Sequence, residues 1–168
     1  MEKYLNKIIE MDALEGLKEL PDECVDTIIT SCPYWGLRDY GVDEQIGLEP
    51  TLEEYLDKLL AITAELKRVL KPTGVCFWNH GDAYASSGSQ RFDKNKYGGK
   101  SGIHCGRARI DNYQTKCMLL QNYRLILRMI DEQGWILRNT IIWYKLNHMP
   151  SSVKDRFLSL IHISEPTR

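Results

Sequence analysis

The stretch Val25-Asp26-Thr27-Ile28-Ile29-Thr30-Ser31-Cys32-Pro33-Tyr34 carries the strongest indication of the fold. Its first six residues are rich in β-branched side chains, with Pro21-Asp22 before them and Pro33 after. Short β-branched runs between turn-forming residues are typical of buried strands. We therefore predict a largely buried strand over residues 25–30, with the chemistry just beyond its carboxyl end.

The residues after this strand are predicted to form a helix and then a second strand. Apolar residues keep helical spacing over residues 52–70, and Thr51 is suited to cap the start of that helix. Pro72 and Gly74 are expected to end the helix. The run 75–79, Val-Cys-Phe-Trp-Asn, has the composition of another buried strand. Strand, helix and strand in this order indicate a parallel sheet.

A second helix and a third strand complete the predicted pattern. Helical spacing returns over residues 118–133, with Gly134 suited to cap the carboxyl end, and residues 135–144 alternate as a strand does. We therefore predict an α/β fold with an open, mostly parallel, Rossmann-like sheet and helices on its faces. Its strand ends should line one crevice, which is the usual ligand site in such sheets.

The composition favours one globular unit without a strong overall electrostatic field. A chain of 168 residues with 43% hydrophobic content can bury one core. The charges nearly cancel to -1, so binding of nucleic acid would need a local basic patch. The amino terminus lacks a signal-peptide pattern and no apolar stretch could span a bilayer, so we expect a cytoplasmic protein without membrane contact. No metal site is predicted, because the cysteines form no CxxC pair and fit reduced thiols: Cys24, Cys32, Cys76, Cys105 and Cys117.

A family resemblance starts at the end of the first predicted strand. The catalytic motif of the DNA amino-methyltransferases, usually written [DNS]-P-P-[YFW], resembles the segment 30–40, Thr-Ser-Cys-Pro-Tyr-Trp-Gly-Leu-Arg-Asp-Tyr. Further blocks similar to that family follow the same order: 12–15, 45–49, 79–84, 141–150 and 152–156. The resemblance implies a partial methyltransferase sheet, S-adenosylmethionine as cofactor, double-stranded DNA as substrate and a role in restriction-modification.

The same resemblance assigns catalytic roles to Ser31, Cys32, Pro33 and Tyr34. Methyl transfer to an exocyclic amine requires acceptors that hold the amine protons and localise its lone pair. Ser31 supplies a side-chain oxygen, and the carbonyl of Cys32 supplies a second acceptor because a residue before proline favours extended geometry. Tyr34 is the expected platform for a base that has been flipped out of the duplex.

Cys32 departs from the family pattern, which has proline at this position. The carbonyl acceptor survives, but the local chain is less rigid. An alternative interpretation makes Cys32 a thiol nucleophile, as in cytosine carbon-5 methyltransferases or cysteine hydrolases. The order Cys-Pro, where the carbon-5 enzymes have Pro-Cys, argues against it.

Further candidates for binding lie around the motif. Trp35 and Trp143 could flank the base or belong to the core. Asp12 resembles the acidic residue that approaches the adenine of the methyl donor, and it is equally suited to cap a helix that starts at Ala13. Asp82 could orient groups in the pocket or form a turn.

A long segment over residues 85–115 is rich in Ser, Gly, Lys and Arg and has no apolar period. Its cations could neutralise DNA phosphates, and a solvated insertion is the alternative. The candidate contacts are Arg91, Lys94, Lys96, Lys100, Arg107 and Arg109.

The similar blocks cover most of residues 1–157, which the resemblance implies are a partial catalytic domain. We expect residues 158–168 to form a tail unlike the family, foreign in origin and without the strand that relatives would have there. The Gly-rich F-x-G-x-G donor loop of the family does not occur in the sequence. The main part of the donor site is therefore expected to lie outside this chain.

Ser31, where many relatives have aspartate, favours N4 of cytosine as the target, and N6 of adenine remains the first alternative. Methylation of RNA or of a protein side chain is a second alternative, and an inactive nucleic-acid-binding fragment is a third. A cognate restriction enzyme is a further expected partner. The recognition sequence and the oligomeric state stay open.

Overall fold

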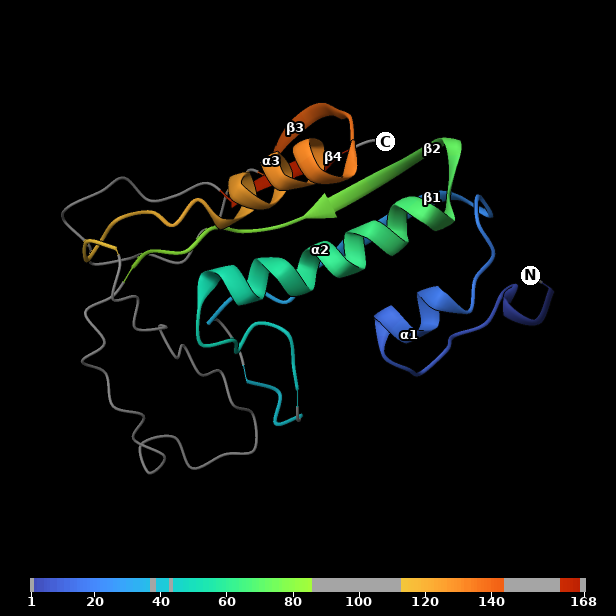
Figure 1. Cartoon of the computed structure of the whole chain (residues 1–168), viewed down its shortest axis with the longest axis horizontal. Coiled ribbons are helices and arrows are strands. Elements are labelled where there is room, and N and C mark those ends of the chain that lie inside the picture. Colours follow the sequence, from blue (N-terminus) through green and yellow to red (C-terminus); the bar gives the residue numbers. More distant parts are fainter. Residues whose placement is uncertain (1, 37–38, 43, 86–112, 144–160, 167–168) are drawn as a thin grey trace.

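The computed structural model describes residues 2–36, 39–42, 44–85, 113–143 and 161–166, with only the backbone for Glu2 and for 161–166. Helices and strands follow one another along the chain (Figure 1). The elements are a 3-10 turn Glu2–Tyr4, α1 Ala13–Lys18, β1 Val25–Ser31, α2 Leu52–Val69, β2 Leu70–Asn79, α3 Gln121–Gln133, β3 Leu137–Trp143 and β4 Ile161–Pro166.

The four described strands form one sheet in the order β1-β2-β4-β3. Strand β1 pairs in parallel with β2, whereas β4 is antiparallel to both β2 and β3. Because β4 is antiparallel to both of its neighbours, β3 runs in the same direction as β2 and β1. The predicted open, mostly parallel α/β sheet is confirmed, and the carboxyl ends of β1, β2 and β3 face the same edge.

Helix α2 begins as predicted but ends differently. The hydroxyl of Thr51 accepts a hydrogen bond from the backbone N–H of Glu54 at 3.2 Å, which caps the helix. The helix stops at Val69 because Leu70 already has extended backbone angles and starts β2. Pro72 and Gly74 therefore lie within β2, and their predicted role in ending the helix is wrong.

The start of α3 is also later than predicted, at Gln121. Residue 120 has a left-handed backbone, which is not helical, and the carboxylate of Asp82 accepts from the N–H groups of Leu120 and Gln121. The other end is as predicted. Gly134 has a left-handed φ of 67°, and its N–H donates to the carbonyl of Ile130 at 3.0 Å.

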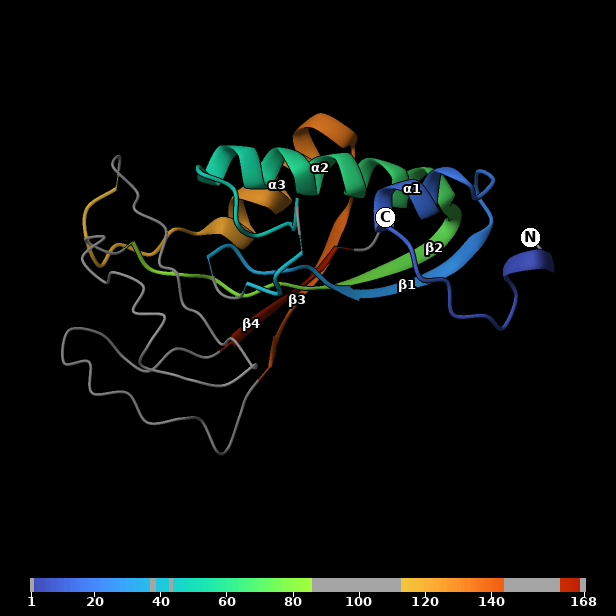
Figure 2. The same ribbon diagram turned by 90° about the horizontal axis from the view of Figure 1, so that it is seen from below.

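The described helices all lie on one face of the sheet (Figure 2). No described helix covers the opposite face, whose side chains include Ile29, 80% exposed, and Phe77, 38% exposed, which are register partners. The prediction that residues 25–30 are largely buried is therefore wrong for this face. Strand β1 also lies at the edge of the described sheet, so neither a helix nor a further strand covers it there.

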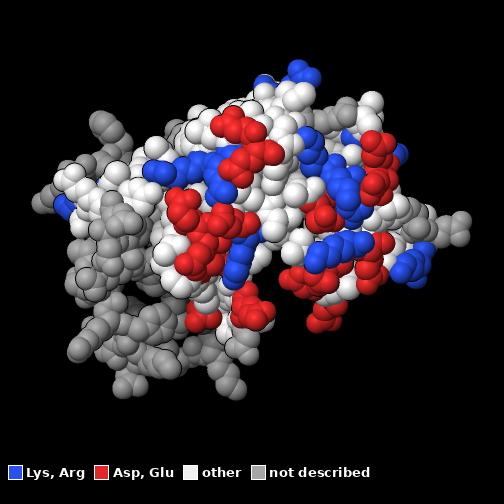
Figure 3. Space-filling model, in the orientation of Figure 1, with Lys and Arg blue, Asp and Glu red and all other residues white. Residues whose placement is uncertain are grey.

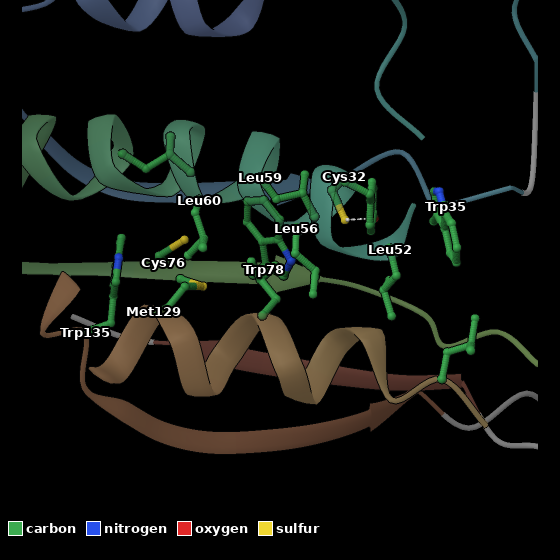
Figure 4. Close-up of a cluster of buried hydrophobic side chains, with 14 of the residues drawn as sticks. Cys32, Trp35, Leu52, Leu56, Leu59, Leu60, Cys76, Trp78, Met129 and Trp135 are labelled. Carbon is green, nitrogen blue, oxygen red and sulfur yellow. Dashed lines mark hydrogen bonds between the residues drawn. The ribbon is translucent and has the colours of Figure 1, made fainter. Parts of the chain in front are cut away.

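The core fills the space between the helices and the covered face of the sheet (Figure 4). Leu56 and Leu59 from α2 meet Cys76 and Trp78 from β2, and Met129 of α3 closes the cluster. All five side chains are at most 2% exposed. This packing fixes α2 against β1 and β2, and thereby sets the position of the loop that follows β1.

The backbone of residues 161–166 forms strand β4, between β2 and β3. The expectation that the tail 158–168 would lack a strand is wrong for this part. The alternating β-branched residues of Ile161-His162-Ile163 suit a strand, and an open position beside β3 is available to pair with them. Within the described ranges, none of the helices is both long and apolar enough to cross a membrane.

Candidate active site

The motif 31–34 starts at the carboxyl end of β1, at the edge shared by the parallel strands. Ser31 is the last residue of β1, is exposed, and has Asn79 of β2 as its register partner. Within the described residues, neither the Ser31 hydroxyl nor the Cys32 carbonyl has a hydrogen-bond partner. Two consecutive residues at a strand end thus each offer an acceptor, as an amine-binding site requires.

The ring of Tyr34 is held in place by three consecutive residues at the carboxyl end of β2, namely Asn79, His80 and Gly81. Its hydroxyl donates to Asn79 Oδ1 at 3.2 Å, and the ring stacks on His80 with centroids 5.8 Å apart. Gly81 lies so close that an added Cβ would be 3.0 Å from Tyr34 Cε2. Burial raises the pKa of the half-buried Tyr34, which keeps it neutral. The ring is therefore a fixed, uncharged surface.

The side chain of Cys32 points into the core rather than into solvent (Figure 4). Its sulfur lies 3.7 Å from the hydroxyl of Tyr55, and the residue is 7% exposed. Burial raises the pKa of the thiol to about 12, so the thiolate is absent at neutral pH. The alternative in which Cys32 is a nucleophile has no support from this geometry.

A cavity of about 530 Å³ adjoins the motif, between α1, the end of β1 and α2. Asp12 stands at its rim with one carboxylate oxygen, Oδ1, accepting from the N–H groups of Leu14 and Glu15. The prediction that Asp12 caps the helix starting at Ala13 is confirmed. Asp12 also lines the cavity. The other lining residues are Ile9, Met11, Ala13, Gly16, Leu17, Leu20, Thr30, Ser31, Cys32, Pro33, Ile46, Leu59, Ile62, Leu66 and Trp78.

The comparison with protein families agrees with this geometry. A family model described as a DNA methylase, of the N6 and N4 type, matches residues 25–162. The chain belongs to this DNA methylase family. The match begins with β1 and includes the whole motif, so the resemblance that the sequence implied is confirmed.

Curated relatives of this chain are type II methyltransferases. M.XycI from Xanthomonas campestris pv. cyanopsidis is 44% identical over 154 residues, covering 89% of this chain and 49% of that protein. M.Cfr9I from Citrobacter freundii is 41% identical over 149 residues, again 89% of this chain and 49% of the relative. The chain spans about half the length of these relatives.

Solved structures share the fold. The PvuII DNA methyltransferase, described as cytosine-N4-specific, aligns with a TM-score of 0.61 at 20% identity, over 94% of this chain and 46% of that one. A Thermus thermophilus protein described as a putative DNA modification methylase, complexed with S-adenosyl-L-methionine, also has a TM-score of 0.61, at 22% identity. The alignment covers 94% of this chain and 50% of that one. The sheet described above is therefore part of a DNA methyltransferase fold.

The two tryptophans predicted to flank the base, Trp35 and Trp143, have different surroundings. Trp35 is 3% exposed, stacks on Tyr55 and donates through its indole N–H to the carbonyl of Glu49 at 2.9 Å. Trp35 therefore belongs to the core, and its ring is too buried to stack on a base. Trp143 ends β3 and is 53% exposed, so its ring remains available.

Of the other residues predicted to bind, Asp82 lies in the described part of the chain and the six cations of the segment 85–115 do not. Asp82 accepts from the backbone N–H groups of Leu120 and Gln121 at the start of α3, and its predicted role in orienting groups of the pocket stays a prediction. The six cations of the segment 85–115 lie outside the described residues: Arg91, Lys94, Lys96, Lys100, Arg107 and Arg109. The face in Figure 3 shows described Lys and Arg interspersed with Asp and Glu, without a broad basic area. Among described residues, no group of three His, Cys, Asp or Glu is arranged to hold a metal ion.

Sequence reasoning missed Tyr55, His80 and Gly81 as parts of the site. Tyr55 occupies an apolar position of α2 and is fully buried, which from the sequence looks like ordinary packing. His80 and Gly81 lie in the block 79–84, whose resemblance to the family was the available signal. Only the fold shows that this block lies directly behind Tyr34.

Proposed function

We propose that this chain carries the amine-binding half of a site-specific DNA methyltransferase. The single observation that supports it best is the pair of open acceptors, Ser31 Oγ and the Cys32 carbonyl, next to the fixed ring of Tyr34. A flipped base stacked on Tyr34 would direct its exocyclic amine toward both acceptors. The amine then donates both N–H groups, and its lone pair is left free to attack.

Cytosine N4 is the proposed target. A serine hydroxyl at position 31 accepts a hydrogen bond without adding a charge, and Ser31 is the feature that separates this chain from relatives with aspartate. During transfer, the nitrogen would form a bond to the methyl carbon while the carbon–sulfur bond of the sulfonium breaks and its electron pair stays on the sulfur, which leaves as S-adenosylhomocysteine. The nitrogen then loses one proton to solvent. Adenine N6 is the alternative outcome of the same assay.

The chain's contribution to donor binding is proposed to be the cavity beside Asp12. Its volume and its apolar walls fit the adenosyl part of S-adenosylmethionine, which when bound supplies an electrophilic methyl group. Asp12 Oδ2 accepts no hydrogen bond from a described residue, because both cap bonds use Oδ1. It can therefore accept from an amino or hydroxyl group of the donor. Ser31 lines the same cavity, so donor and amine would meet at this residue.

The function is tested by incubating the full-length protein with duplex DNA and isotope-labelled S-adenosylmethionine and analysing the nucleosides by mass spectrometry. Label in N4-methylcytosine is expected, and label confined to N6-methyladenine would refute the cytosine assignment. The variant Ser31→Ala should lose the product. Thr73→Ala, which removes an exposed hydroxyl elsewhere on β2, should keep it.

Donor binding is tested separately by calorimetry with S-adenosylmethionine and no DNA. Asp12→Asn keeps an oxygen for the helix cap but removes the charge at the cavity, so it should weaken binding. Asp131→Asn changes an exposed carboxylate of α3 and is the matched control. An equal effect of both variants would contradict a donor site beside Asp12.

A further inference from the structure

The hydroxyl of Tyr55 connects the catalytic motif to a buried histidine. Tyr55 is fully buried on α2, and its hydroxyl donates to the carbonyl of Pro33 at 2.8 Å. The same oxygen lies 3.0 Å from Nε2 of His80, which is 1% exposed. Three separate parts of the chain therefore meet at one oxygen atom: α2, the loop after β1 and the end of β2.

The number of protons gives these contacts a direction. A tyrosine hydroxyl has one proton, and the Pro33 carbonyl can only accept, so the Tyr55 proton goes to Pro33. The contact with His80 is then made by an Nε2–H that donates to the Tyr55 oxygen. The other ring nitrogen, Nδ1, carries no proton and has no partner among the described residues. Burial lowers the pKa of His80 to about 3, which is consistent with a neutral ring.

This arrangement fixes the peptide next to the acceptors. The proline ring already restricts φ of Pro33, and a hydrogen bond to its carbonyl restricts ψ as well. The orientation of Cys32 on one side and of Tyr34 on the other is then set relative to α2. Cys32 has no ring to restrict its own backbone, so the external bond from Tyr55 matters more here than beside a proline.

His80 acts on the motif in a second way. Its ring stacks on Tyr34 with an interplanar angle of 29° and meets Trp78 and Tyr55 edge-on. One imidazole thus supports the stacking surface directly and the carbonyl side through Tyr55. A substitution that removes only the hydroxyl of Tyr55 separates the two effects.

We propose that Tyr55 and His80 are positioning residues for methyl transfer, acting through the chain of hydrogen bonds from His80 Nε2–H to the Tyr55 hydroxyl and on to the Pro33 carbonyl. This chain directs the Cys32 carbonyl and the Tyr34 ring at the target amine. The proposal rests on the proposed function, in which those two groups bind the base. Neither residue touches the base itself.

The direction of the hydrogen bonds is tested by NMR on the chain with ¹⁵N-labelled histidine, without DNA or donor. His80, assigned by the loss of its signals in His80→Gln, should be the neutral Nε2–H tautomer at neutral pH. Tyr55→Phe should shift the His80 nitrogens and the Pro33 carbonyl carbon. Tyr4→Phe removes a hydroxyl that donates to Glu19 far from the motif and should shift neither. An Nδ1–H tautomer, or no shift in Tyr55→Phe, would overturn the proposal.

The positioning effect is tested in the methyl-transfer assay. Tyr55→Phe should lower kcat by roughly tenfold to a hundredfold and leave KM for S-adenosylmethionine within about twofold. His80→Gln, whose amide N–H can still donate to Tyr55, should keep more activity than His80→Leu. An unchanged kcat in Tyr55→Phe contradicts the proposal. Failure of the unsubstituted full-length protein to methylate DNA counts against the proposed function alone, because the NMR experiment requires no turnover.

Discussion

Asp82 Oδ2 accepts a hydrogen bond from the backbone N–H of Leu120 at 3.0 Å, although 38 residues separate the two along the chain. Its other oxygen accepts from the N–H of Gln121 at 3.1 Å. No side chain of the helix's own first residues caps α3. Asp82 therefore provides the cap from the segment that also carries His80, and ties the region behind Tyr34 to α3.

Removal of this cap should destabilise the fold. We expect Asp82→Ala to lower the free energy of unfolding by roughly 1–2 kcal/mol, because two backbone N–H groups lose their acceptor. Asp82→Asn keeps one acceptor oxygen and should have a smaller effect. Urea denaturation measures these differences. Asp131→Ala, an exposed change within α3, should stay within about 0.5 kcal/mol, and a similar loss there would contradict the cap.

Cys32 should be unreactive in the folded chain. Its thiol is buried, with a pKa of about 12, and Cys76 has the same pKa for the same reason, whereas Cys117 is exposed. Brief treatment with iodoacetamide at neutral pH should label Cys117 and leave the other two unmodified, as read by peptide mass spectrometry. Denaturation in urea should expose all three. Fast labelling of Cys32 without denaturant would revive the nucleophile interpretation.

His80 should make stability depend on pH. Its folded pKa of about 3 lies below the usual value of 6.5, so the neutral ring favours folding above pH 6.5. As the pH falls below 6.5, the unfolded chain binds a proton that the folded chain excludes. The free energy of unfolding should then decrease by up to about 1.4 kcal/mol per pH unit.

The contribution of His80 is isolated by the difference between the chain and His80→Gln. Other titrating groups act on both proteins and cancel in that difference. Urea denaturation is compared between pH 7 and pH 5, a range that ends about half a unit above the usual glutamate pKa of 4.5. The free energy of unfolding should fall more steeply in the unsubstituted chain than in His80→Gln. Equal slopes would mean that the folded chain binds a proton at His80 as readily as the unfolded chain does.

Ile28 and Ile29 should respond differently to the same substitution. Ile28 packs against the core under the helices, whereas Ile29 is 80% exposed on the face that no described helix covers. Threonine keeps the β-branched shape in both cases. Ile28→Thr should cost about 1–3 kcal/mol, and Ile29→Thr should stay within about 0.5 kcal/mol while reducing self-association. Denaturation and light scattering measure the two effects, and a large loss of stability at position 29 would mean that this face is covered.

The sequence predicted the helices and strands where local pattern decides them. The spacing of apolar residues located α2, and short apolar runs located the central parts of β1 and β2. The tolerance of glycine for a left-handed backbone located the end of α3 at Gly134. The start of α3 was missed because its cap comes from Asp82, a distant residue. The exposed face of β1 was missed because an apolar run looks alike whether one face or both are covered.

The candidate site was predictable to the extent that it lies in one segment. Ser31, Cys32 and Tyr34 lie within four consecutive residues, and the family resemblance identifies them together. Tyr55 was not predictable, because its spacing in α2 is that of a core residue and its hydroxyl finds partners only in the folded chain. The burial of Cys32 and Trp35 likewise depends on how α2 packs on the loop after β1.

The placement of β4 has a consequence for the order in which the molecule assembles. In the described sheet, β3 pairs with β4 and reaches β2 only through it. On a ribosome, residues 137–143 would emerge well before residues 161–166 and would have no neighbour to pair with. The parallel pair of β1 and β2 can form during translation, whereas β3 must wait until β4 has left the exit tunnel.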